Sequence, residues 1–234
     1  MAATTPGRRA ENRAAMTAAI RRLGREHLST HGAAGLSLRA IARDLGIVSS
    51  AVYRYVPSRD DLLTALLVEG YTDLADAVDA AIATVDETEC RARIVAACRA
   101  ARQWGVADAA RWALLYGSPV PGYAAPPEQT AGPGTRVVGA LLAELARAHA
   151  LGQLATALPA VPADTADDLA GIRAEFGVNL PDPAIALGTA LWATLIGAVG
   201  LEVFGQYGPG GFGAAEPMFT VQLGPVLDAL FGAT

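Results

Sequence analysis

A short run of small, hydroxylated and cationic side chains carries the most distinctive chemistry of this 234-residue chain. It consists of Ser49, Ser50, Tyr53, Arg54 and Tyr55. Small side chains let a helix approach another molecule closely, whereas hydroxyl and guanidinium groups can hydrogen-bond to base edges and phosphates. A helix meant only for packing would not expose such a face. The run therefore predicts a helix that enters the major groove of double-stranded DNA.

The residues before this run predict the element that supports it. Gly46 stands where a tight turn needs a left-handed backbone, and the side chain of Ile47 is expected to be buried beneath that turn. We expect the second helix to make about two turns, from Ser49 to Tyr55, with its cap at Val48 or one residue later. The whole unit is a helix-turn-helix over residues 37–56. Its first helix presents apolar residues at helical spacing, namely Leu38, Ile41, Ala42 and Leu45.

Helices are also predicted on both sides of this unit. The first runs from about Glu11 to His31, where Gly32 is a plausible stop. After the unit, Pro57 ends one helix and Ser58 caps the next, with two acidic residues in its first turn.

The stretch from Leu36 to Leu63 resembles the DNA-binding domain of the tetracycline-repressor (TetR) family. Val48, Val56 and Arg59 stand where that family usually has serine, phenylalanine and lysine. A second stretch, Arg111 to Pro126, resembles the C-terminal domain of a TetR subgroup that carries a GxPVPGY segment. The matching residues of the first stretch are Leu36, Ser37, Ile41, Ala42, Gly46, Tyr53, Arg54, Tyr55, Pro57, Ser58, Asp60, Asp61 and Leu62.

The resemblance implies a homodimeric repressor of the TetR type, released from operator DNA by a small apolar effector. Ser50 and Tyr53 are the candidates for base edges, with Ser49 on the same helix. The candidates for phosphates are Arg39, Arg54, Tyr55 and Arg59. Alternatives stay open for some of them: Tyr53 or Tyr55 could pack against the first or fourth helix, and Arg39 could lie on a solvated face.

Charge is distributed unevenly along the chain. The net charge is −5, but residues 1–60 carry ten arginines against four acidic residues, a net +6. Residues 61–234 carry eight arginines against nineteen acidic residues, a net −11. A basic end on an acidic body fits a protein that docks one end on phosphates. Arg8, Arg9 and Arg13 form either a basic arm along DNA or a solvated tail.

The composition argues against several classes of enzyme. All 18 cationic residues are arginine, so a P-loop, a Schiff base and a kinase phosphate site each lack their lysine. No GxSxG motif is present. We therefore expect no catalysis and no cofactor, with a helical enzyme of unknown chemistry kept as an alternative.

The cysteines and histidines do not predict a metal site. Cys90 and Cys98 are about 12 Å apart along one helix, too far for a disulfide. This fits a reducing cytoplasm, with a redox-sensing pair as the alternative. His27 and His31 are four residues apart and could share zinc, but no third ligand accompanies them.

The rest of the chain is predicted to be helical. No alternating strand pattern appears, so the fold class is all-α, with a DNA-binding domain over 1–60 and a regulatory and dimerisation domain over 61–234. Further helices are expected near 88–104, 108–116, 135–151, 164–176, 184–206 and 215–232. The Pro/Gly-rich segment 117–134 is predicted to be a loop.

Residues 183–201 carry no charge and are long enough to span a membrane. A single-span membrane-anchored protein is therefore an alternative. We favour a helix buried by its own domain and a partner subunit, because the segment is rich in small residues and no arginine follows Arg173 to set an orientation. Residues 1–15 are polar and do not resemble a signal peptide.

Two further sets of residues are assigned to regulation. Aromatic residues are expected to line an apolar effector pocket: Trp104, Trp112, Tyr116, Tyr123, Phe176 and Trp192. Apolar residues of the last two helices are expected to form the isologous dimer interface: Leu187, Leu191, Leu195, Val199, Phe219, Leu223 and Leu227.

Overall fold

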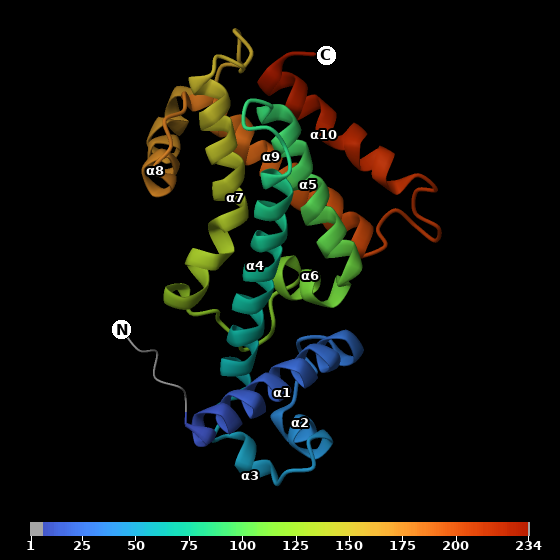
Figure 1. Ribbon diagram of the computed structural model, residues 1–234. Coiled ribbons are helices and arrows are strands. Elements are labelled where there is room, and N and C mark those ends of the chain that lie inside the picture. The colour runs from blue at the N-terminus through green and yellow to red at the C-terminus, as the bar shows by residue number, and fades with distance from the viewer. Residues whose placement is uncertain (1–6, 234) are drawn as a thin grey trace.

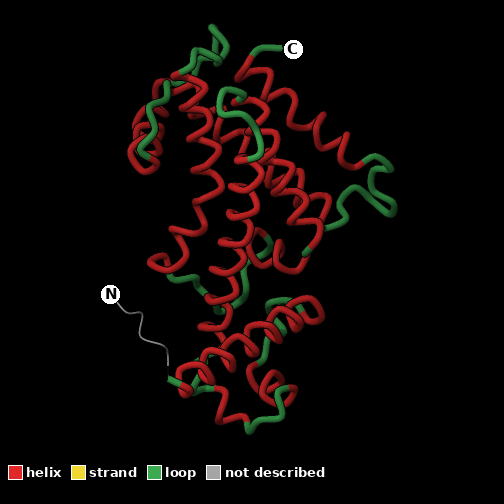
Figure 2. Tube along the Cα trace, in the orientation of Figure 1, coloured by secondary structure: helices red, strands yellow, loops and turns green. Residues whose placement is uncertain are grey.

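The computed structural model describes residues 7–233, and all regular structure in that range is helical (Figures 1 and 2). The all-α prediction is confirmed. The α-helices are α1 (Arg8–His31), α2 (Leu38–Asp44), α3 (Ser49–Val52), α4 (Arg59–Ala83), α5 (Cys90–Ala107), α6 (Ala109–Tyr116), α7 (Pro127–Ala150), α8 (Ala166–Phe176), α9 (Asp182–Val203) and α10 (Ala215–Phe231). A 3₁₀ turn, Ala163–Thr165, precedes α8.

Helix α4 joins the two ends of the molecule. In Figure 1, α1, α2 and α3 form one end, and α4 runs from them into the middle of the remaining helices. Its start matches the prediction, because the Ser58 hydroxyl accepts a hydrogen bond from the Asp61 amide at 3.0 Å. Asp60 and Asp61 occupy the first turn, where the helix dipole favours negative charge.

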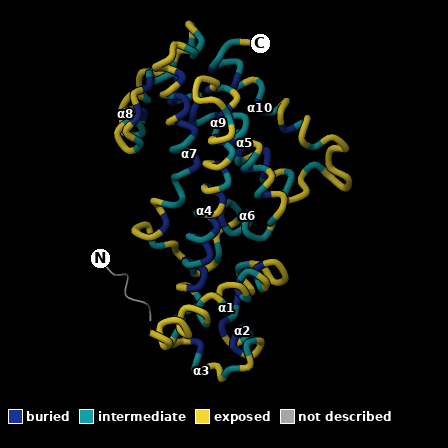
Figure 3. Tube along the Cα trace, in the orientation of Figure 1, coloured by how far each residue is buried: buried dark blue, intermediate teal, exposed yellow. Residues whose placement is uncertain are grey.

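The molecule has two hydrophobic cores, and α4 contributes to both (Figure 3). Its first turns supply Leu62, Leu63 and Leu66 to the core of α1, α2 and α3. Its later turns supply residues such as Leu74 to the core of the other helices. Leu114 on α6 packs against both cores. Helices α4 and α6 are therefore the physical links between the two ends.

Helix α9 is the most apolar helix, and it packs against α5, α6, α7, α8 and α10. By length and composition it is the one described helix that could cross a membrane. However, 44% of its most apolar window is buried inside the protein. Packing against five neighbouring helices explains part of its apolar character.

A buried ion pair holds the far end of α4. The Arg93 guanidinium donates two hydrogen bonds to the Glu144 carboxylate, at 2.7 and 2.9 Å. It also donates to the carbonyl oxygens of Ile82 and Val85, where α4 ends. The hydrogen bonds that Arg93 donates to Glu144 raise the pKa of Arg93. One guanidinium thus ties together α4, α5 and α7.

Two of the differences from the predicted boundaries concern segments to which the sequence assigned no helix. Helix α1 begins at Arg8, so Arg8, Arg9 and Arg13 lie on a helix and do not form an extended arm. Helix α7 begins at Pro127, so the predicted loop 117–134 is helical over its second half. Proline is favoured at the first helical position because its missing N–H would be unpaired there anyway. Pro133 is accommodated inside the same helix.

Candidate nucleic-acid interface

A capped helix and a glycine turn set the direction of α3. The Ser37 hydroxyl accepts a hydrogen bond from the Ala40 amide, which caps α2. Gly46 has φ +67°, the left-handed conformation that the sequence predicted. After it, the Ile47 amide donates to the carbonyl oxygen of Ala42 at 3.0 Å and closes the turn.

Helix α3 is shorter than predicted. It spans Ser49–Val52, and the expected second turn is replaced by hydrogen-bonded turns through Tyr55. Two features explain the difference. Pro57 disfavours a helical conformation at Val56, and the side chains of Val52 and Val56 are both buried in the core beneath. The predicted helix over Ser49 to Tyr55 is therefore wrong in its second half, although the segment keeps a tight, right-handed course.

The polar edge of this segment faces solvent. Ser49, Ser50, Tyr53 and Arg54 are all exposed, and Tyr53 has 44% of its surface accessible. The Arg54 side chain forms no hydrogen bond or ion pair with any residue of 7–233. These side chains are free to meet another molecule, and α3 lies at one extremity of the fold (Figure 1).

A concave surface lies between α2 and α3. It is lined by Arg39, Arg43, Val48 and Ser49, among other residues. Arg39 is exposed and, like Arg54, has no polar partner within the described range. An unpaired guanidinium beside the recognition segment fits a contact with the DNA backbone.

Tyr55 is in a different position from its neighbours. It is half-buried and packs against the core of α1, α2 and α4. The guanidinium carbon of Arg13 lies 5.8 Å from the centre of its ring, within cation–π range. This geometry favours the packing alternative for Tyr55, and it brings Arg13 of α1 close to the recognition segment.

Arg59 is occupied by the protein itself. Its Nε donates to the carbonyl oxygen of Leu36 at 3.2 Å, and its Nη2 donates to those of Ala33 and Ala34 at 2.9 and 3.3 Å. The side chain thus holds the connection between α1 and α2 against the start of α4. The phosphate contact predicted for Arg59 would have to compete with three hydrogen bonds.

His27 is likewise used within the fold. Its Nε2 lies 2.8 Å from an Asp44 carboxylate oxygen and joins α1 to the end of α2. The His31 ring centre lies 5.6 Å from that of His27. Within residues 7–233 no group of three potential metal ligands is assembled.

Comparison with known proteins agrees with this geometry. Residues 20–66 match the family described as bacterial regulatory proteins of the tetR family. Residues 94–224 match the tetracyclin repressor-like C-terminal domain. The chain belongs to the TetR family. TetR proteins are DNA-binding transcriptional regulators, so α2 and α3 are the helix-turn-helix of such a regulator.

Relatives cover most of this TetR chain. It is 52% identical over 202 residues to the HTH-type transcriptional regulators Rv1816 of Mycobacterium tuberculosis and Mb1846 of Mycobacterium bovis, covering 86% of each chain. The crystal structure of the regulatory protein SCO4313 has a TM-score of 0.77 at 28% identity, covering 95% of this chain and 99% of that one. The TetR regulator PfmR of Thermus thermophilus shares the fold, with a TM-score of 0.56 at 16% identity over 92% of this chain and 98% of PfmR.

The structure gathers only part of the predicted effector pocket. Tyr116 packs against Trp112 and Trp192, with ring centres 4.7 and 5.9 Å away, and also against Tyr71. The other three predicted residues make their printed contacts outside this cluster. The Arg111 guanidinium lies over the Trp104 ring, and the Tyr123 hydroxyl is hydrogen-bonded to that of Thr64. The Phe176 ring lies close to Gly139. Tyr71 was missed because it follows the apolar spacing of α4 and looks like ordinary core.

Two buried polar atoms in this aromatic cluster have no partner in the described part of the chain, Trp112 Nε1 and Tyr116 Oη. Burial raises the pKa of Tyr116, and the neighbouring Tyr71 adds to the effect. The phenol is therefore neutral at any ordinary pH. Unpaired buried polar groups are uncommon in proteins.

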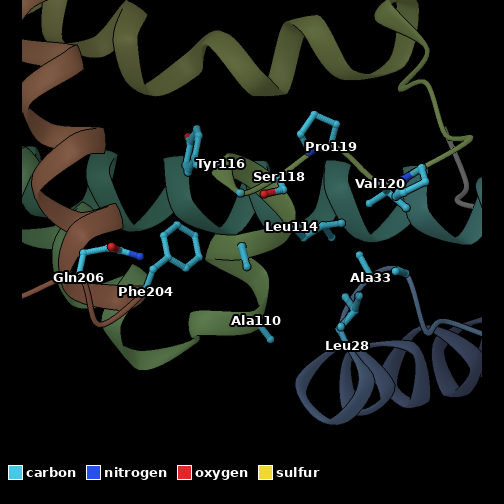
Figure 4. Close-up of a pocket in the computed structure, with 15 residues that line it drawn as sticks. Leu28, Ala33, Ala110, Leu114, Tyr116, Ser118, Pro119, Val120, Phe204 and Gln206 are labelled. Atoms are coloured by element: carbon cyan, nitrogen blue, oxygen red, sulfur yellow. The ribbon is translucent and has the colours of Figure 1, made fainter. Parts of the chain in front are cut away.

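The main cavity near this cluster lies between the two ends of the protein (Figure 4). Its volume is about 860 Å³, and Tyr116 is its one predicted residue. The other lining residues share no single helical spacing in the sequence, because they come from the end of α1, from α6 and from loops. The lining is Leu28, Gly32, Ala33, Ala34, Ala110, Ala113, Leu114, Tyr116, Gly117, Ser118, Pro119, Val120, Pro121, Phe204 and Gln206.

The predicted dimer interface needs correction. Leu191, Leu195, Val199, Phe219, Leu223 and Leu227 are buried in the core of their own chain, so they cannot form an interface. Leu187 alone of the predicted set is half-buried. An apolar helix such as α9 does not reveal from sequence which face its own domain covers. The outer faces of α9 and α10 carry other residues: Ala186, Ala190, Ala193, Gly197, Leu201, Val221 and Pro225.

Proposed function

We propose that this TetR regulator is a cytoplasmic, homodimeric repressor that binds operator DNA through α3 and is released by a small apolar effector. The observation that carries the proposal is the exposed polar edge of Ser49, Ser50, Tyr53 and Arg54 at one extremity of the fold. Val52, by contrast, is fully buried in the core beneath this edge. The chain is not expected to catalyse a reaction.

Two roles follow from exposure. Ser50 and Tyr53 are proposed to contact base edges, because they are exposed on the segment that would enter the groove. Arg39 and Arg54 are proposed to contact phosphates, because their guanidinium groups are exposed and unpaired within residues 7–233. The Arg13 guanidinium lies over the ring of Tyr55, which packs against the core next to this surface.

The test uses a DNA fragment from upstream of the protein's own gene. The wild-type chain should shift it with a strong dependence on salt. Tyr53→Ala should lower affinity for this fragment by at least about tenfold while leaving circular dichroism and molecular mass unchanged. Tyr207→Ala, in the loop between α9 and α10, is the matched control. Unchanged operator affinity in Tyr53→Ala would mean that the tyrosine does not read bases.

A homodimer is proposed on the outer faces of α9 and α10. These faces are made of small and apolar residues, and Val221 has 67% of its surface accessible. One short recognition segment reads only a few base pairs, so a two-fold partner that supplies a second half-site would raise both affinity and specificity. The proposal requires an isologous arrangement whose two-fold axis places the two α3 segments on the same side of the dimer.

Mass measurement in solution tests the dimer. The wild-type protein should have twice the chain mass at micromolar concentration. Val221→Glu should shift the equilibrium toward monomer by at least about tenfold, because it places a charge in an apolar contact. Ala170→Glu, on the exposed side of α8, is the control. A wild-type monomer at these concentrations would contradict the proposal.

A further inference from the structure

We propose that the cavity between the two ends of the chain binds an uncharged, mainly apolar small molecule, and that the bound molecule controls DNA binding by fixing the end of α1 relative to α6. The inference rests on the proposed function, since it gives the effector a site and a mode of action. In Figure 4 the side chains of both ends, such as Leu28 and Leu114, face this one space.

The size and chemistry of the cavity indicate the kind of ligand. Its volume of about 860 Å³ lies within the range of small-molecule sites. All the lining residues belong to the described chain, and none of them carries a charge. An ionic ligand would lose its hydration there without gaining a counter-charge, which is costly. An uncharged, apolar molecule is therefore favoured.

A few polar groups would orient such a molecule. The Ser118 hydroxyl and the Gln206 amide line the cavity, and neither side chain is hydrogen-bonded to another part of residues 7–233. An oxygen acceptor on the ligand fits these two donors.

The lining comes from both functional ends. Leu28, Ala33 and Ala34 belong to α1 and its exit, whereas Ala113 and Leu114 belong to α6. The binding free energy of a ligand that touches both sides depends on their separation. Such a ligand favours one separation over others, which is the differential affinity that any effector requires.

The wall on the DNA-binding side is connected directly to the helix-turn-helix. Ala33 and Ala34 line the cavity, and their carbonyl oxygens accept hydrogen bonds from Arg59. The same guanidinium donates to Leu36, which immediately precedes the cap of α2. A displacement of Ala33 is therefore passed to the start of α2 and to the start of α4. This short path links the ligand to the position of α3.

The experiment uses two fluorescent probes that share one ring system. N-phenyl-1-naphthylamine is uncharged, and 8-anilinonaphthalene-1-sulfonate carries a sulfonate. The uncharged probe should bind one site per chain at least about tenfold more tightly than the anionic one. Ala113→Phe should weaken that binding by at least about tenfold, because the added ring occupies part of the cavity. Ala109→Phe is the matched control, because Ala109 is exposed on the same helix and does not line the cavity.

Coupling is measured in two ways. Saturating uncharged probe should weaken binding to the upstream DNA fragment by about fivefold or more, and DNA should weaken probe binding by the same factor. The probe should also slow hydrogen exchange of the amides over 32–37 in wild type and Ala109→Phe, but not in Ala113→Phe. This second measurement needs no DNA.

The outcomes separate this inference from the proposed function. If the protein does not shift DNA in the absence of probe, the proposed function is contradicted. The hydrogen-exchange measurement still tests whether the probe binds in the cavity and restrains residues 32–37. Equal probe binding by Ala113→Phe and Ala109→Phe would show that the probe binds elsewhere and would overturn the inference. So would saturation of the site with no change in exchange over 32–37.

Discussion

The role of Arg59 can be separated from that of a phosphate-binding arginine. Arg59 donates three hydrogen bonds to carbonyl oxygens, and 31% of its side-chain surface is accessible. A hydrogen bond from a charged group contributes roughly 1.5–3 kcal/mol, but two of these three are long, at 3.2 and 3.3 Å. We therefore expect Arg59→Ala to lower the free energy of unfolding by about 2 kcal/mol. For a chain of this size that corresponds to a melting temperature roughly 4–8 °C lower.

Arg39→Ala is the matched comparison. Arg39 is exposed and has no polar partner in residues 7–233, so its loss should leave stability within about 0.5 kcal/mol. If Arg39 contacts one phosphate, the slope of log affinity against log salt should become shallower by about 0.9. Arg59→Ala should leave that slope unchanged.

The assay measures both quantities on the same proteins. Urea unfolding gives stability, and fluorescence anisotropy on the upstream fragment at several salt concentrations gives the slope. The reasoning is refuted if Arg59→Ala unfolds like wild type and loses about one unit of salt slope. That pair of results would mean that Arg59 leaves its carbonyl partners and binds a phosphate.

Two further predictions concern the interior. Glu144→Leu leaves the buried Arg93 unpaired and should cost about 3–5 kcal/mol in urea unfolding; adding Arg93→Met should recover most of the loss, and no recovery would show that the pair is not the source. Burial raises the pKa of the Cys98 thiol to about 12, so the thiolate fraction at pH 8 is only about 10⁻⁴. Cys98 should therefore resist iodoacetamide in the folded protein and react in urea, as mass spectrometry of the labelled peptide would show; rapid labelling of the folded chain would contradict its burial.

Local signals in the sequence predicted much of the DNA-binding end. The Ser58 cap and the Gly46 turn each depend on one residue with a specific backbone or hydrogen-bonding role, so their places could be read directly. The length of α3 could not, because it depends on how deeply Val52 and Val56 enter a core that distant residues complete. The hydrogen bonds of the Arg59 side chain could not be predicted either, because their acceptors are carbonyl groups 23 to 26 residues earlier in the chain.

The helices after α4 were harder to predict, because their roles also depend on tertiary packing. Leu191 and Val199 look equally suited to a core or to an interface, and only the positions of five neighbouring helices decide between them. The cavity is lined by loop residues such as Ser118 and by residues beyond the end of α9, such as Gln206. No spacing rule brings these residues together, because tertiary packing alone makes them neighbours.

The sharing of α4 between the two cores has a consequence for engineering hybrid regulators. Leu62, Leu63 and Leu66 complete the interior of the DNA-binding end, although they lie beyond residue 60. A chimera that joins this end to another sensor at residue 60 would take those three leucines from the donor sensor. A chimera joined after Leu66 would keep these three core leucines. The residue that replaces Leu114 in the donor protein would then have to pack against this core.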